Sequence, residues 1–339
     1  MRARALYFTG PGELEVRERE VSEPGEGEVR VRAECSMVSP GTELLVYRGE
    51  ASDDLAADSQ LDSLSGSLSF PLRYGYAVVG RVTATGPGVD PSWEDRRVLA
   101  FHPHESRFCA PVEELQPVPE DCPSEAAAFL PNVETAVNFL HDGAPVLGER
   151  AVVFGQGVVG LLTTALLSRC PLDGLATVDR YDSRRERSAT LGADATFEPG
   201  EGVADRLREW ADGEEAEGAD LTYELSGSPA ALDAAIDATG YDGRVLVGSW
   251  YGSKLAELHL GGRFHRSRVS VESTQVSTVA PERRGRWTKA RRLDAAWRRL
   301  REIRPERFVT HEFDLGEAEE AYRALDERPE ETLGVLLTY

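Results

Sequence analysis

The ten residues AVVFGQGVVG, positions 151–160, decide the fold of this 339-residue chain. Four apolar residues typical of a buried strand run directly into the pattern G-x-G-x-x-G, and the apolar stretch Val158–Arg169 predicts a helix after it. Such a loop binds a dinucleotide because its glycines permit a tight turn and close backbone approach, and the helix start faces the phosphates. The candidate cofactor-binding residues of this loop are Gly155, Gln156, Gly157, Val158, Val159 and Gly160.

An acidic residue follows the next predicted strand, Leu175–Val178. A carboxylate at this position, Asp179, can hold the adenosine ribose hydroxyls, which favours NAD. Arg180 and Arg184 lie close by and could grip a 2′-phosphate, so NADP stays an alternative.

Strands and helices alternate from residue 150 onward with short connections, which predicts an α/β fold with a doubly wound parallel sheet. Two later strands end in small residues, among them Ser226 and Gly248. Small residues there leave room for the nicotinamide side of a cofactor, although they are also common at strand ends.

The chain ends look different from this middle part. The first hundred residues are rich in short β-branched runs punctuated by Gly and Pro, which predicts a small barrel or sandwich. Residues 52–69 are polar and acidic, which predicts a loop. The last segment, Phe308–Tyr339, reads as strand, helix and strand.

The charge is strongly negative, with 59 acidic and 38 basic residues and a net charge of −21. This charge opposes binding to nucleic acid or to an anionic membrane. It favours a halophile, whose carboxylates work in molar salt; an ordinary acidic protein from a GC-rich genome is the alternative. Against this background we interpret the basic stretch Trp287–Ile303 as a solvated or interdomain helix rather than a nucleic-acid patch.

Other features bound the location and the metal chemistry. No apolar run approaches the length of a membrane span and no signal peptide precedes the first strand, so we expect a cytoplasmic protein. None of the four cysteines pairs as C-x-x-C, which leaves no zinc-ribbon spacing and fits free thiols.

In this order of segments the chain resembles the medium-chain dehydrogenase/reductase superfamily, the fold of zinc alcohol dehydrogenases and quinone reductases. The resemblance implies a GroES-like β-rich catalytic domain, residues 1–147 completed by 281–339, and a Rossmann domain, residues 148–280. It also implies a homodimer, which we expect to form at an apolar edge strand near Val269–Gln275.

The departures from the superfamily concern zinc. Zinc members carry C-G-[ST]-D where this chain has Ser39-Pro40-Gly41-Thr42-Glu43, so Pro40 takes the cysteine position. They carry G-H-E where this chain has Gly75-Tyr76-Ala77, so Tyr76 takes the histidine position. Because proline cannot ligate zinc and tyrosine rarely does, we expect no catalytic zinc and no other metal.

Without zinc, a hydrogen-bond donor or an acid–base group must act on the substrate oxygen. Thr42 stands where the family's hydroxyl relay lies, and Tyr76 could donate its phenol. The full set of catalytic candidates is Thr42, Tyr76, Glu43, Glu134 and His102. His102 and His104 form an H-x-H pair expected on one face of a strand, for which metal binding, proton transfer and a structural role stay open.

The function that these residues predict is a zinc-independent NAD(P)-dependent oxidoreductase for an alcohol/ketone pair. The pattern S-x-G-T-E is similar to that of bacteriochlorophyllide hydroxyethyl dehydrogenases, which implies a bulky secondary alcohol as the small-molecule substrate, and we expect a haloarchaeal source. Reduction of activated carbon–carbon double bonds and non-catalytic cofactor binding are the alternatives.

Overall fold

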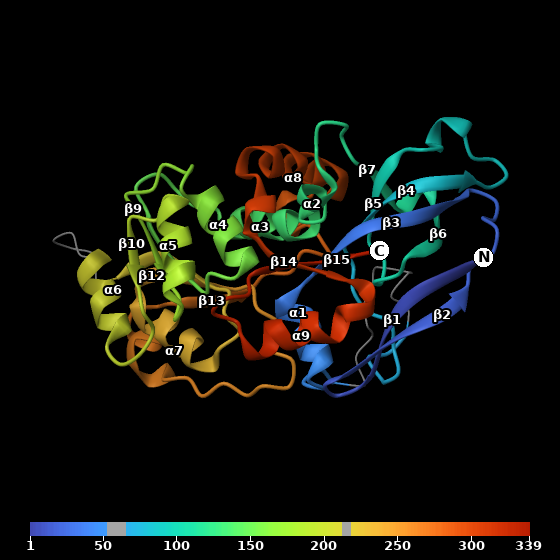
Figure 1. Ribbon diagram of the computed structural model, residues 1–339. Helices are drawn as coiled ribbons and strands as arrows, with labels where there is room; N and C mark the ends of the chain where they lie inside the picture. Colours follow the sequence, from blue (N-terminus) through green and yellow to red (C-terminus); the bar gives the residue numbers. More distant parts are fainter. Residues whose placement is uncertain (53–65, 212–217) are drawn as a thin grey trace. The chain divides into compact units, whose positions relative to one another are not determined.

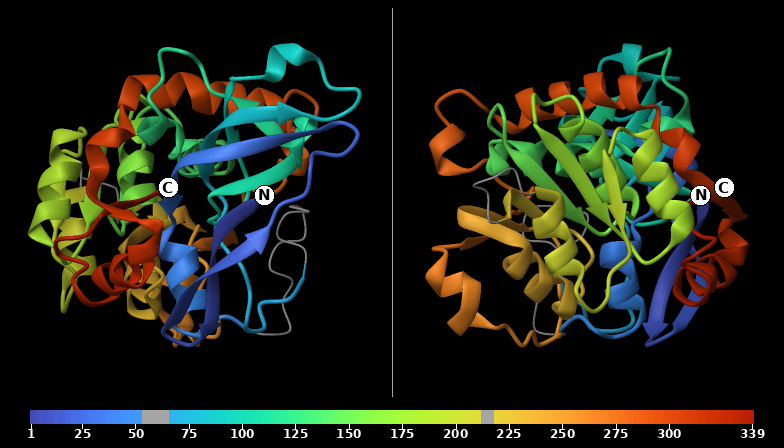
Figure 2. Two further views of the ribbon diagram at one scale, coloured as in Figure 1. Left: turned by 45° about the vertical axis from the view of Figure 1, so that its right-hand side comes forward. Right: turned by 90° about the vertical axis from the view of Figure 1, so that its left-hand side faces the viewer.

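The computed structural model describes residues 1–52, 66–211 and 218–339, and most of the predicted loop 52–69 lies outside this range. The described chain divides into two units (Figures 1 and 2). The β-rich unit consists of Met1–Pro131 and Arg304–Tyr339, and the parallel-sheet unit consists of Asn132–Ile303.

The parallel-sheet unit is built on one sheet with all strands parallel, in the order β10-β9-β8-β11-β12-β13 among the described residues. Its strands are β8 (Arg150–Phe154), β9 (Gly174–Val178), β10 (Ala195–Phe197), β11 (Ala219–Glu224), β12 (Thr239–Val247) and β13 (Ser270–Ser273). The chain starts in the middle of the sheet at β8 and winds outward on each side, which is the doubly wound order.

Helices cover both faces of this sheet (Figure 2, right). They are α3 (Leu130–Gly143), α4 (Val158–Leu167), α5 (Asp182–Thr190), α6 (Val203–Ala211), α7 (Pro229–Ala238) and α8 (Lys289–Ile303). Successive residues of β8 point to opposite faces, so Val153 packs with Leu167 of α4 while Val152 packs with Leu207 of α6.

The β-rich unit contains antiparallel strands from the first part of the chain: β1 (Arg2–Gly10), β2 (Glu13–Glu20), β3 (Glu28–Val38), β4 (Val78–Thr85), β5 (Arg97–Ala100), β6 (Arg107–Pro111) and β7 (Leu115–Pro117). Its main sheet has the order β14-β15-β3-β4-β5-β7, and β6 also pairs with β3. The last two strands, β14 (Val309–Asp314) and β15 (Gly334–Thr338), join it because β15 pairs antiparallel with β3. The predicted combination of a doubly wound parallel sheet and a separate β-rich part is therefore confirmed.

The helices of the β-rich unit, in the part of the chain that the structure describes, are α1 (Pro40–Tyr47), α2 (Ser124–Ala127) and α9 (Ala318–Glu327). Short 3-10 turns occur at Pro91–Trp93, Val112–Glu114, Pro281–Arg283, Pro305–Phe308 and Leu315–Glu317. No helix in the described residues is long and apolar enough to cross a membrane.

Two expectations about local structure are wrong. His102 and His104 lie outside any strand and their rings do not share a face, because one stacks on Phe108 and the other turns into the core. The edge strand β13 is not apolar: its residues are Ser-Val-Glu-Ser and all four are exposed.

Candidate functional site

The glycine loop shows which of its glycines the fold itself requires. Gly155 has a φ of +89°, and a Cβ there would lie 2.7 Å from the backbone nitrogen of Ser226. A Cβ on Gly160 would lie 1.9 Å from the carbonyl oxygen of Gly155. A Cβ on Gly157 would meet no atom within 4 Å. No residue that the structure describes therefore demands a glycine at position 157, and the open space there fits the close approach of a dinucleotide phosphate.

The Gln156 side chain holds this loop in place through buried hydrogen bonds. It is fully buried, its Nε2 donates to the carbonyl of Gly155 at 3.1 Å, and its Oε1 accepts from Thr164 Oγ1 at 2.9 Å. Val158 is buried and Val159 is half-buried at the start of α4. The backbone of this loop, rather than its side chains, is thus what a cofactor could contact.

Asp179 lies directly against the glycine loop at the end of β9. Its Oδ2 accepts from the backbone N–H of Gln156 at 2.7 Å and its Oδ1 accepts from that of Tyr181 at 2.9 Å, and only 8% of the residue is exposed. Arg180 and Arg184 instead place their guanidinium groups over the Tyr181 ring, at 4.6 and 4.9 Å from its centre. The Asp179 carboxylate is therefore the charged group that contacts the loop directly, and the nearby Arg185 guanidinium donates to the Asp179 carbonyl at 2.6 Å.

The ends of β11 and β12 are organised by a buried carboxylate that the sequence reasoning did not single out. Glu224 accepts from the backbone N–H groups of Ser226 at 2.7 Å and Gly227 at 3.1 Å, and from the Tyr251 hydroxyl at 2.8 Å. Burial and the nearby Glu224 raise the pKa of Tyr251. The available signal for this role was a glutamate at the end of a strand with Ser-Gly two residues later, in Glu224-Leu225-Ser226-Gly227.

Gly248 and Ser226 have close neighbours inside the protein. A Cβ on Gly248 would lie 2.4 Å from Cζ of Phe139, so packing against α3 already requires that glycine. The Ser226 hydroxyl donates to Glu224. Both residues lie at the carboxyl edge of the parallel sheet, where cofactors bind in this fold.

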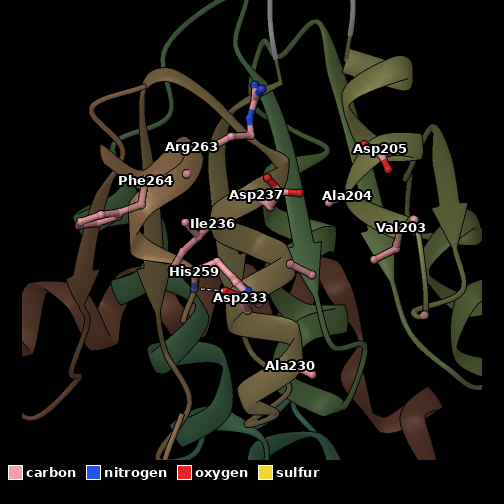
Figure 3. A pocket seen from close by; sticks show the side chains of 14 residues that line it. Val203, Ala204, Asp205, Ala230, Asp233, Ile236, Asp237, His259, Arg263 and Phe264 are labelled. Atoms are coloured by element: carbon pink, nitrogen blue, oxygen red, sulfur yellow. Dashed lines mark hydrogen bonds and ion pairs between the residues drawn. The ribbon is translucent and has the colours of Figure 1, made fainter. Parts of the chain in front are cut away.

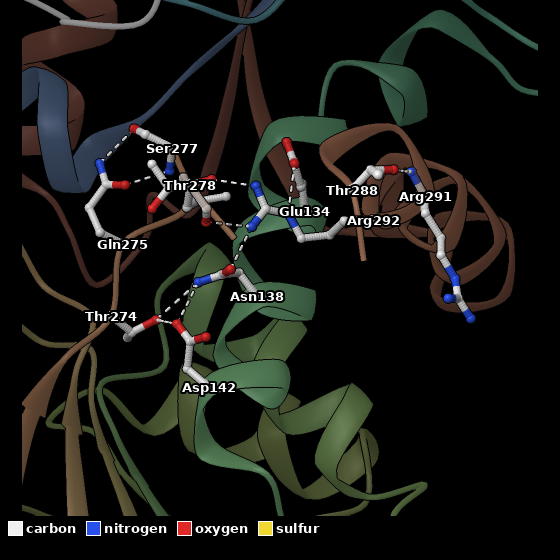
Figure 4. A network of polar contacts seen from close by, with 11 residues as sticks. Glu134, Asn138, Asp142, Thr274, Gln275, Ser277, Thr278, Thr288, Arg291 and Arg292 are labelled. Atoms are coloured by element: carbon white, nitrogen blue, oxygen red, sulfur yellow. Dashed lines mark hydrogen bonds and ion pairs between the residues drawn. The ribbon is translucent and has the colours of Figure 1, made fainter. Parts of the chain in front are cut away.

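Glu134 is buried in α3 and committed to an arginine. Its Oε1 lies 2.9 Å from Nε of Arg292, which is itself fully buried (Figure 4). Burial raises the pKa of Glu134, and the Arg292 charge opposes that rise. This pairing gives Glu134 a structural partner inside the parallel-sheet unit.

The β-rich unit holds a second buried cluster, centred on Glu43 in α1. Its Oε1 accepts from the backbone N–H of Ser39 at 2.7 Å. Its Oε2 lies 2.9 Å from Nε2 of His104 and accepts from the Tyr322 hydroxyl. Glu43, His104 and Tyr322 are all fully buried, so both carboxylate oxygens are occupied in the interior.

The cluster continues from the histidine to the last residue of the chain. His104 Nδ1 lies 2.7 Å from the hydroxyl of Ser36, which lies 2.7 Å from the Tyr339 hydroxyl. Burial raises the pKa of Tyr339. Ser36 and Glu43 are far from His104 and Tyr339 in the sequence, and no local sequence pattern predicts that they contact one another.

Three of the catalytic candidates, Tyr76, Thr42 and His102, are half-buried. The Tyr76 phenol donates to the Ser39 hydroxyl, and Ser39 is in turn held through its backbone by Glu43. His102 stacks on Phe108 with ring centres 3.8 Å apart, and burial lowers the pKa of His102 to about 3. A neutral, stacked ring is a poor proton donor near neutral pH.

The residues at the family's zinc positions do not fit zinc. Pro40 has no side-chain donor, and Tyr76 donates its phenol to Ser39. Within residues 1–52, 66–211 and 218–339, no three His, Cys, Asp or Glu side chains gather into a metal-binding group. No catalytic step is therefore assigned to a metal.

A separate groove of about 370 Å³ lies on the parallel-sheet unit between α6, α7 and the turn Leu260–Phe264 (Figure 3). His259 Nδ1 lies 2.6 Å from Oδ2 of Asp233 there, and this hydrogen bond raises the pKa of His259. The groove is lined by other residues than those of the glycine loop.

Comparisons with known proteins agree with this architecture. Residues 158–293 match the family model described as zinc-binding dehydrogenase. Sorbitol dehydrogenase 1 of Saccharomyces cerevisiae is 29% identical over 143 residues, which are 41% of this chain and 40% of that protein. The chain thus spans well under half the length of that relative.

A longer match is L-threonine 3-dehydrogenase of Pyrococcus horikoshii, 26% identical over 283 residues, with 74% of this chain and 77% of that protein covered. An alcohol dehydrogenase of Escherichia coli CFT073, solved in complex with NADH, shares the fold with a TM-score of 0.79. It is 19% identical, with 100% of this chain and 99% of that chain covered. The chain is thus similar in sequence to zinc-type dehydrogenases over part of its length, and it shares its fold with the solved alcohol dehydrogenase.

Proposed function

We propose that this protein is an NAD-dependent dehydrogenase that interconverts a secondary alcohol and a ketone by hydride transfer, without catalytic zinc. The observation that carries the proposal is the glycine loop: Gly157 faces open space, although the neighbouring Gly155 and Gly160 are required by packing. A glycine with no neighbour of its own at the start of α4 is what close approach of a dinucleotide phosphate needs.

NAD rather than NADP is supported by the position of Asp179. Its carboxylate is fixed beside the loop by two backbone N–H groups, where it can accept from ribose hydroxyls and repel a 2′-phosphate. Arg180 and Arg184 lie over Tyr181, so neither replaces the carboxylate at that point. The bound cofactor would supply the hydride donor or acceptor, and the protein would supply binding and orientation.

The substrate oxygen needs a donor from the protein, and we take Tyr76, which stands at the position of the family's histidine ligand, as one candidate. Its phenol can give a proton to the alkoxide that forms when a ketone accepts hydride. The Ser39 hydroxyl, which contacts the phenol oxygen, can then donate to the phenolate that remains. Thr42, two residues into α1, is the second candidate donor.

Finer features of the proposal come from the sequence. A bulky substrate follows from the resemblance of the S-x-G-T-E pattern, and the charge of −21 supports a halophilic, haloarchaeal protein. A cytoplasmic homodimer, paired along β13 at the sheet edge, is also part of the proposal. Neither nucleic acid nor membrane is proposed as a partner.

The test is a fluorescence titration with NADH and NADPH in about 2 M KCl, which screens the carboxylate-rich surface. We expect NADH to bind at least about tenfold more tightly than NADPH, a difference of about 1.4 kcal/mol. Asp179→Asn should narrow that ratio, whereas Asp173→Asn, an exposed change after α4, should leave it unchanged. If folded wild-type protein binds neither nucleotide, the dehydrogenase proposal is wrong.

A further inference from the structure

A fully buried arginine ties three parts of the parallel-sheet unit together (Figure 4). Arg292 of α8 binds Glu134 of α3 at 2.9 Å through Nε, and its Nη1 donates to Oδ1 of Asn138 at 2.6 Å. Nη1 also donates to the carbonyl of Thr278 at 3.0 Å, and Nη2 donates to that of Val276. An arginine so placed is expensive to bury, so its several acceptors must be held in place to offset the cost.

The partners on α3 form a polar row. Glu134, Asn138 and Asp142 are spaced four residues apart, which puts them on one face of the helix. Asn138 Nδ2 donates to Thr274 Oγ1 at 3.0 Å and to Asp142 Oδ2 at 2.9 Å, and Thr274 donates to Asp142. The loop after β13, residues 274–278, is therefore held at Thr274 through its side chain and further along through two carbonyls.

The position of this loop follows from the topology of the sheet. The glycine loop follows β8 in the middle of the sheet, and Asp179 follows β9 on one side of it. A dinucleotide with its pyrophosphate on the glycine loop and its adenosine ribose at Asp179 must extend its other half toward the carboxyl ends of β11, β12 and β13. The backbone N–H of Thr274 donates to the carbonyl of Val247 at 3.0 Å, so the 274–278 loop adjoins the end of β12.

We propose that Arg292 is a positioning residue for the nicotinamide half of the cofactor, because it fixes the backbone of the 274–278 loop against which that half would lie. This inference rests on the proposed function. On this inference, the buried contacts of Arg292 serve the cofactor site. Without the guanidinium, the Val276 and Thr278 carbonyls lose their donors and the loop is free to relax.

The test separates the two halves of the cofactor by comparing NADH with ADP-ribose, which lacks nicotinamide. Arg292→Lys keeps a positive charge near Glu134 but cannot reach all four acceptors, and the double variant Arg292→Gln with Glu134→Gln removes both buried charges. Arg298→Gln is the matched control, since Arg298 is an exposed arginine of the same helix. Thermal unfolding of each variant is followed in parallel.

We expect both Arg292 variants to weaken NADH binding about tenfold while ADP-ribose binding stays within about twofold, and the control to change neither. An equal loss for both ligands would overturn the inference, because Arg292 would then support the unit as a whole. Unchanged NADH binding in a folded variant would overturn it as well. Wild-type protein that binds neither ligand would instead contradict the proposed function on which the inference rests.

Discussion

Gly157 and Gly160 belong to the same loop, but the reason why each position holds a glycine differs. A Cβ at Gly160 would lie 1.9 Å from a backbone oxygen, whereas one at Gly157 would enter open space. The contact at Gly160 lies inside the protein, whereas for Gly157 the proposed function supplies the reason for a glycine, namely a bound dinucleotide. We therefore expect a side chain at position 160 to affect stability and one at position 157 to affect cofactor binding.

Substituting alanine at each position tests this distinction. Gly160→Ala should lower the free energy of unfolding by about 1–3 kcal/mol or more, because the backbone must shift. Gly157→Ala should leave unfolding nearly unchanged and weaken NADH binding at least about tenfold, because the methyl group occupies phosphate space. Thermal unfolding and fluorescence titration of both variants measure these effects. Equal NADH binding by Gly157→Ala and wild type would contradict the interpretation.

The roles of Tyr76 and Thr42 can be tested by removing their hydroxyl groups. We expect Tyr76→Phe to lower kcat about a hundredfold, because a positioned proton donor contributes that much or more. Thr42→Ala should have a smaller effect, and NADH binding should be unchanged in both variants. Turnover is measured on bulky ketones, secondary alcohols and enones. If both variants keep full turnover, reduction of carbon–carbon double bonds becomes the better reading.

At the scale of secondary structure elements, α1 and α3 each carry a glutamate that the sequence suggests as a catalytic residue but that lies in the core. Glu43 and Glu134 each stand in a segment that the family resemblance connects with the active site. Both are buried and paired, one with His104 and Tyr322 and the other with Arg292. Their partners come from α9, α8 and the segment after β5. Every one of these pairs is more than sixty residues apart in sequence, so no local pattern reveals them.

The segment between β5 and β6 makes stability depend on pH. In the folded protein burial lowers the pKa of His102 to about 3, whereas an unfolded histidine titrates near pH 6.5. Between these values only the unfolded state binds the proton, so stability falls as the pH drops from 6.5 toward 3. Above pH 6.5 neither state binds it and this contribution is constant.

Chemical unfolding at a series of pH values should show this effect in one variant. His102→Gln should flatten the loss of stability between pH 6.5 and 4 relative to wild type. His265→Gln, a change at an exposed histidine, should keep the wild-type slope. Parallel curves for wild type and His102→Gln would show that the ring is protonated as readily in the folded protein as in the unfolded one.

At the scale of the whole molecule, a charge of −21 sets the conditions under which the protein is stable. Repulsion between like charges destabilises a compact state and is screened by salt. We expect the midpoint of thermal unfolding to rise by about 5–10 °C or more between 0.1 and 2 M KCl, which is a gain of a few kcal/mol for a chain of this size.

Sucrose provides the control for this experiment, because it favours burial without screening charge. At matched osmolality it should raise the midpoint by less than KCl does. A midpoint that is the same at 0.1 and 2 M KCl would argue against a halophilic protein and for an ordinary acidic one.

The sequence by itself determined the fold class and the glycine loop. Both depend on short-range patterns: apolar runs set the strands, and three glycines at fixed spacing set the turn between β8 and α4. The position of Asp179 at the end of a strand also follows from local pattern, because the carboxyl ends of parallel strands share one edge. Such features can be predicted without knowing which distant segments of the chain contact one another.

Only the tertiary structure decided which polar residues lie in the core and what they contact. Arg292 reads as one of many surface arginines, Glu43 as a candidate base, and His102 and His104 as a matched pair, until burial assigns each its partners. A buried charge is tolerated only where partners from other segments satisfy it, and those partners are brought together by packing. For this reason the glycine loop could be located from the sequence, whereas the buried polar residues around it and their partners could not.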